Sequence, residues 1–201
     1  MMKLQKASMT HARSVAGVLL MSLIFWLLPL DPLASASSEA EALYQEAADA
    51  YHALQKSEQK KKKRVYWKRC ILRFERVYET FPKSNRADDA LYMVGRLYEE
   101  LSHYSGLASD LNLAISPYQR LTILYPASRY ADDAQFRIAV IQQESGDYER
   151  AYLGFSKVVE RFPAGDMVGE ARQRLAELEP YLPKPKRLVQ VTGIRHWSSP
   201  D

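Results

Sequence analysis

The sequence is poor in the residues that build reactive sites. Its 201 residues contain one cysteine and four histidines. The cysteine, Cys70, cannot close an internal disulfide, so the stability of the chain has to come from packing. His52, His103 and His196 lie in separate segments, without the paired spacing that is typical of a metal site. We therefore expect no metal site and no cofactor.

Signatures of catalysis are also lacking. The sequence has no glycine-rich phosphate loop and no nucleophile elbow. The carboxylate pairs Asp88-Asp89 and Asp132-Asp133 each open a predicted helix, where negative charge offsets the helix dipole. We interpret both pairs as helix starts and not as acid–base residues, so we expect no catalytic residues in this chain. Whether a longer gene product would be an enzyme stays open.

Strand signals are missing from residues 38–179, and proline occurs there almost only where helices should begin or end. This pattern predicts an all-α fold. Asp110 and Asp147 are the predicted N-caps of two of the helices. The predicted helices cover residues 39–57, 64–80, 87–103, 110–124, 131–144, 147–161 and 167–179.

Charge is absent from residues 15–30, an apolar run that follows three basic residues and precedes the small-residue site Ala34-Ser35-Ala36. This layout predicts a secretory signal peptide over residues 1–36, cleaved after Ala36, and hence a periplasmic protein that engages the membrane only during export. An uncleaved anchor is the alternative, although the run is shorter than the roughly 20 apolar residues that span a bilayer. Cys70 is too far from the signal to carry a lipid.

The excess of positive charge is small. The formal net charge is +4, and removal of residues 1–36 takes away three positive charges and one negative charge, which leaves +2. This balance argues against a nucleic-acid partner. The basic run from Lys60 to Arg64 fits a solvated linker between two helices, and the alternative is a contact with anionic lipid or cell-wall polymer.

Two segments of the chain nearly repeat each other. Residues 81–90 and 125–134 share an aromatic residue, proline, serine and Ala-Asp-Asp-Ala at the same offsets, and a weaker third copy begins at Phe162. Such repetition predicts an array of short helical units, and arrays of this kind usually bind other molecules instead of catalysing reactions.

The repeat resembles the tetratricopeptide repeat when Pro163 is placed near the end of a helix–turn–helix unit of about 34 residues. Small residues then occupy the positions where paired helices cross, and large aromatic residues fill the space between neighbours; these residues are Gly95, Ala114, Ala139, Ala151, Tyr118 and Phe155. Cys70 falls in a small-residue position, which favours a core residue over a reactive thiol. Gln135 and Gln142 depart from the pattern and predict a looser or more exposed helix.

The Phe-Pro-x-Ser and Ala-Asp-Asp-Ala variant is similar to that of bacterial envelope proteins, among them BamD-like outer-membrane assembly lipoproteins and the periplasmic coordinator of the Tol-Pal system. The resemblance implies a solenoid of about three repeats over residues 37–179, closed by a terminal helix. It also implies a concave groove for an envelope protein or peptide, lined by Asp89, Tyr92, Arg96, Glu99, Glu100, Asp133, Phe136, Val140, Gln143 and Glu144.

Within that groove Tyr92, Phe136 and Val140 would be the apolar anchors, and the charged residues would form a polar frame. The alternative is that some of these aromatic residues pack against the neighbouring helix.

The character of the sequence changes after the array. Residues 180–188 form a proline- and lysine-rich linker, residues 188–197 read as a strand, and residues 189–201 are the predicted start of a truncated β domain. The segment from Val191 to Asp201 resembles the opening of the AMIN domain. The resemblance implies the N-terminal recruiting region of a zinc-dependent N-acetylmuramoyl-L-alanine amidase, with peptidoglycan bound through an AMIN domain that continues beyond this chain. The alternative is a stand-alone envelope adaptor of the outer-membrane-assembly or Tol-Pal coordinator type.

Overall fold

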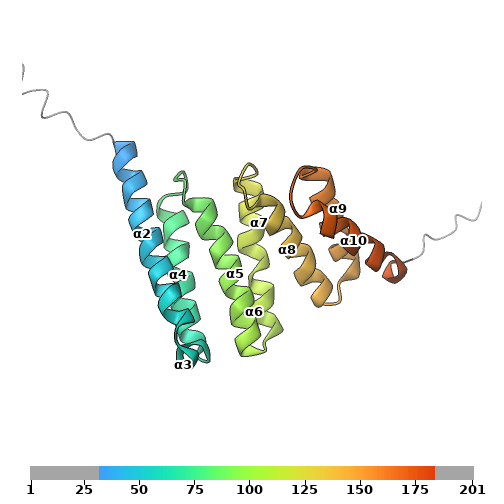
Figure 1. Ribbon diagram of the computed structural model, residues 1–201, viewed down its shortest axis with the longest axis horizontal. Coiled ribbons are helices and arrows are strands. Elements are labelled where there is room, and N and C mark those ends of the chain that lie inside the picture. The colour runs from blue at the N-terminus through green and yellow to red at the C-terminus, as the bar shows by residue number, and fades with distance from the viewer. Residues whose placement is uncertain (1–31, 184–201) are drawn as a thin grey trace, which may run out of the picture. The chain divides into compact units, whose positions relative to one another are not determined.

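The computed structural model describes residues 32–183, and within them all regular elements are helical (Figure 1). The predicted all-α fold is therefore confirmed for this part of the chain. Most of the predicted signal peptide, part of the linker and the strand-like tail lie outside the described residues. The helices are α2 (Pro32–Gln55), α3 (Glu58–Lys61), α4 (Arg64–Thr80), α5 (Ala87–Ser105), α6 (Ala108–Leu113), α7 (Ile115–Leu124), α8 (Ala131–Glu144), α9 (Tyr148–Arg161) and α10 (Val168–Leu178), followed by the 3-10 turn η2 (Glu179–Tyr181).

The chain divides into two compact units, and the boundary falls between Met93 and Val94, inside α5. The described part of the first unit holds α2, α3, α4 and the start of α5. The second unit holds the rest of α5 and the helices from α6 to α10. Each unit has its own helix packing, which the next paragraphs describe separately.

Three helices end in the same way. The residue before proline is Phe81 after α4, Tyr125 after α7 and Phe162 after α9, and each leaves the helical region with φ near −130° (−127°, −130° and −127°). Their backbone N–H groups still donate to carbonyls of the last turn. Because a residue that precedes proline is driven out of the α region, these aromatic–proline pairs stop the helices as predicted.

In the first unit, α2 packs against α4, whose buried face carries Trp67, Ile71 and Phe74. The Tyr44 ring of α2 meets the Phe74 ring edge-on, with 5.4 Å between centroids. Cys70 is buried on the same helix, and burial raises the pKa of its thiol. The predicted role of Cys70 as a core residue therefore agrees with the structure.

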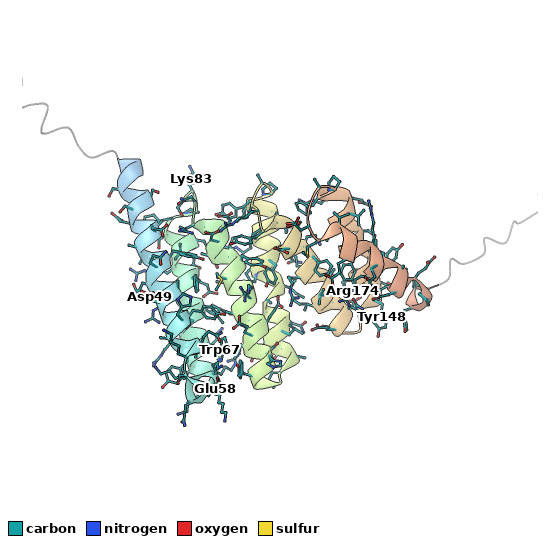
Figure 2. All side chains as sticks on the ribbon, in the orientation of Figure 1. Asp49, Glu58, Trp67, Lys83, Tyr148 and Arg174 are labelled. Carbon is teal, nitrogen blue, oxygen red and sulfur yellow. The ribbon has the colours of Figure 1, made fainter. Side chains whose placement is uncertain are left out.

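The basic run between α2 and α4 is not a plain linker. Ser57 caps the short helix α3, and the Lys61 side chain is buried and forms an ion pair with Glu58. The Trp67 indole donates a hydrogen bond of 2.7 Å to the Lys61 carbonyl, so the segment is packed onto α4 (Figure 2, where Glu58 and Trp67 are labelled). The prediction of a solvated linker is wrong for Lys61. Its side chain is buried, and its carbonyl accepts the hydrogen bond of the buried Trp67 indole.

In the second unit, α8 packs against both α7 and α9, and α9 packs against α10. Two helical glycines mark close approaches between helices. A Cβ on Gly95 would lie 2.4 Å from the Tyr118 ring, and a Cβ on Gly154 would lie 2.7 Å from the Ala139 Cβ. The helices can reach these distances only because the side chains are absent.

Two predictions about this unit need correction. The helix predicted over residues 110–124 is divided at Ala114 into α6 and α7, because Pro117 has no N–H to donate to the carbonyl four residues earlier. Asp110 is not an N-cap, because α6 begins at Ala108 and its N-cap is Leu107. It lies inside α6, fully buried, and accepts a hydrogen bond of 2.9 Å from the Ser105 hydroxyl.

Gln135 is also unlike its prediction. Its side chain is 6% exposed and donates to the Gly154 carbonyl of α9 at 3.4 Å, so the first helix of this repeat is neither loose nor exposed at that position. The amide satisfies a backbone acceptor at the α8–α9 crossing, which explains how a polar residue is tolerated there. Gln142 is half-buried.

Candidate functional site

Glu99 of α5 connects three helices of the second unit. Its carboxylate accepts a hydrogen bond of 2.6 Å from the Tyr118 hydroxyl of α7 and one of 3.0 Å from Nε of Arg137 of α8. The Glu99 side chain is 12% exposed, whereas that of Arg137 is 40% exposed. Glu99 therefore positions α5 against α7 and α8, and it presents little surface to a partner.

More accessible polar side chains lie on the same two helices, α5 and α8. Arg96 and Glu100 form an i,i+4 ion pair of 3.3 Å on α5, and their side chains are 47% and 25% exposed. Glu144 at the end of α8 is exposed. We use the name α5–α8 face for six polar residues of these two helices: Arg96, Glu99, Glu100, Arg137, Gln143 and Glu144.

Gln143 has an unusual environment on the α5–α8 face. Its Oε1 atom is buried, and no donor within residues 32–183 reaches it. A buried acceptor without a hydrogen bond costs about 1–3 kcal/mol.

The apolar anchors predicted for the groove on α8 belong to the core. Phe136 and Val140 are 4% and 8% exposed, and they share a buried cluster with Phe155 of α9 and Leu178 of α10. The Phe136 and Phe155 rings lie 5.2 Å apart. The predicted exposure of Phe136 and Val140 is wrong, because the helices that follow α8 cover this side of it.

The predicted site residues of the first unit are Asp89 and Tyr92. Asp89 is 5% exposed and accepts a hydrogen bond of 2.7 Å from Arg86, which also donates to Glu41 of α2 at 2.9 Å. The hydrogen bond from Arg86 lowers the pKa of the Glu41 carboxyl. Asp89 thus belongs to an ion-pair cluster that fixes α2 at the start of α5. Tyr92 is half-buried.

Asp133, at the start of α8, is half-buried. Burial raises the pKa of its carboxyl, and the nearby Asp132 and Asp166 carboxylates raise it further. The three carboxylates lie close together because the start of α8, with Asp132 and Asp133, lies near the turn after α9, which carries Asp166. Both effects make the charged form of the Asp133 carboxylate less favourable in the folded chain.

Sequence reasoning missed Arg137 and the hydroxyl of Tyr118. Arg137 lies between the positions that line the groove in tetratricopeptide repeats, and only its charge could have suggested a partner on the preceding repeat.

Within residues 32–183, no three His, Cys, Asp or Glu side chains gather in a way that could hold a metal ion. Over the same residues, no helix has the length and apolar character needed to cross a bilayer.

Residues 133–165 match the family model of the tetratricopeptide repeat. The matched segment covers nearly all of α8, the whole of α9 and the Phe162-Pro163 turn, which is the repeat unit that the sequence pattern predicted. No curated protein matches the sequence significantly. The match and the helical structure together support a tetratricopeptide-repeat protein. Repeats of this kind are protein–protein interaction modules.

Proposed function

We propose that this chain is an exported envelope protein whose repeats bind a partner protein, and that it forms the recruiting region of an N-acetylmuramoyl-L-alanine amidase. The observation that carries the binding function is the tetratricopeptide hairpin of α8 and α9. Export and the link to an amidase depend on the sequence alone, through the resemblance of residues 1–36 to a signal peptide and of residues 191–201 to the start of an AMIN domain.

The partner contacts the α5–α8 face in this proposal. Arg96, Glu100 and Glu144 offer both signs of charge on the surface, whereas the Gln143 Oε1 atom is buried and takes no part in the contact. Because Phe136 and Val140 are held in the core, polar contacts decide which partner fits this part of the array. Polar complementarity favours recognition of a defined surface over general adhesion.

Site-specific photocrosslinking tests the binding face. The full chain would carry a photoreactive amino acid at Arg96 or Glu144, and in the control at Arg172, which is exposed on α10. In the native host we expect one discrete crosslinked protein from positions 96 and 144 and none from position 172. Equal crosslinking from all three positions, or none from the face, would contradict the proposal.

Detection of the natural gene product tests the amidase assignment. An antibody raised against this chain would locate the product in cell fractions, and a peptidoglycan zymogram would report amide-bond hydrolysis. We expect an envelope protein that is longer than this chain and active in the zymogram. An inactive envelope protein of mature length would support the adaptor alternative, and a cytoplasmic product would contradict both.

A further inference from the structure

A hollow of about 490 Å³ lies in the second unit, between α7 and α9. Its floor is α8, which packs against both of these helices. Gln135, Ile138 and Gln142 of α8 line it, three and four residues apart, so they share one face of that helix. Phe136 and Val140 point from a different face. The α7–α9 hollow is therefore a surface distinct from the α5–α8 face.

The walls of the hollow expose aliphatic side chains. Ile123 of α7 is 71% exposed and Leu153 of α9 is 59% exposed, although both are large enough to contribute to a core. Covering an apolar side chain stabilises a complex in proportion to the area removed from water, at roughly 25 cal/mol per Å². Two such side chains beside a hollow are suited to contacts with apolar groups of a bound segment.

The charges around the hollow are mostly positive. Arg150, Lys157 and Arg161 of α9 line it together with one carboxylate, that of Glu160. Arg150 is engaged by Asp147 at 3.3 Å, but its side chain remains 73% exposed. Lys157 is exposed on the same helix, one turn beyond Leu153. Basic side chains that frame apolar ones favour an occupant that combines carboxylates with aliphatic residues.

We propose that the α7–α9 hollow binds an acidic, amphipathic segment of a partner protein. Aliphatic side chains of that segment contact Ile123 and Leu153, while its carboxylates pair with Lys157 and the neighbouring arginines. A hollow of this size accommodates a few side chains, as pockets for small ligands do. A second copy of this chain fits less well, because a twofold contact would place the same basic side chains opposite each other.

Selection from a phage-displayed library of random peptides against the full chain tests this proposal. We expect the selected peptides to be enriched in Asp and Glu together with Leu, Ile or Phe. Lys157→Glu and Leu153→Ser should each weaken their binding at least tenfold. Added salt should weaken binding as well, since exposed charges contribute to it.

Two matched variants control for the nature of the changes. Arg172→Glu reverses a charge on α10, and Leu113→Ser removes a leucine that is 43% exposed on α6 and does not line the hollow. Both should bind the peptides as the unchanged chain does, and circular dichroism should show that all four variants keep their helices. Loss of binding in both control variants to the same extent would overturn the proposal.

Other occupants would give different results. Selection of basic peptides, or of none that depend on Lys157 or Leu153, would overturn the proposal. A dimer in sedimentation that Leu153→Ser dissociates would assign the hollow to a second copy of the chain. Binding to vesicles of anionic lipid that Lys157→Glu abolishes would assign it to a membrane surface. Crosslinking from Arg96 is independent of all these outcomes, so failure here leaves the proposed function standing.

Discussion

At the scale of single residues, burial decides which side chains of a repeat hold the fold and which remain accessible. Phe136 and Arg137 are neighbours on α8, yet Phe136 is 4% exposed in the core and the Arg137 side chain is 40% exposed. The tetratricopeptide pattern assigns Phe136 to the groove. The structure assigns it to the packing of α8 against the helices that follow.

Truncation of Phe136 should therefore act on stability. We expect Phe136→Ala to lower the free energy of unfolding by about 3–5 kcal/mol, because the substitution leaves a cavity beside Phe155 and Leu178. Urea unfolding followed by helical circular dichroism measures this change. The control Glu144→Ala alters an exposed residue and should stay within about 0.5 kcal/mol of the unchanged chain. An unchanged free energy of unfolding in the Phe136→Ala variant would contradict a core role for Phe136 and support its predicted role in the groove.

At the scale of elements, local sequence defines the turn between α8 and α9. Gly146 has φ of +78°, its N–H donates to the Gln143 carbonyl, and the N–H of Asp147 donates to the Gln142 carbonyl. This pattern of two bonds is a Schellman motif, in which glycine accepts the left-handed conformation. Asp147 then accepts a hydrogen bond of 3.1 Å from the Arg150 N–H and starts α9, as predicted.

Removal of this cap has a predictable cost. Asp147→Ala should lower the free energy of unfolding by about 1 kcal/mol, because an N–H of the first turn loses its acceptor. Asp147→Asn keeps an oxygen acceptor and should recover most of that loss. Thermal unfolding of the two variants beside the unchanged chain makes the comparison. Equal losses would show that the charge of Asp147, and not its capping bond, stabilises the start of α9.

The helices were more predictable than the contacts between them. Periodicity and aromatic–proline ends are local features, so the bounds of α4 and α8 follow from the sequence alone. The burial of Phe136 depends on residues of α10, and the pair of Glu99 with Arg137 joins two separate helices. Neither is visible in a local pattern. The division between α6 and α7 was not predicted, although proline disrupts a helix interior and Pro117 was the residue that could have indicated it.

At the scale of the whole molecule, one packing rule recurs along the chain. Cys70 is buried on α4, Gly95 lies against the Tyr118 ring, and Gly154 lies against Ala139. Gly95 and Gly154 let their helices approach a neighbour closely, and Cys70 occupies the corresponding small-residue position on α4. The proposed functions of the α5–α8 face and the α7–α9 hollow both depend on this packing, because it positions the helices that carry them.

Equilibrium unfolding of Gly154→Ala beside Gly169→Ala tests the packing rule most directly. Alanine favours a helix over glycine by about 1 kcal/mol, and a Cβ at Gly169 meets nothing within 4 Å, so Gly169→Ala should raise the free energy of unfolding. Gly154→Ala should lower it by about 1–3 kcal/mol, because the new Cβ overlaps Ala139. A gain in stability in both variants would show that α8 and α9 do not require a small residue where they cross.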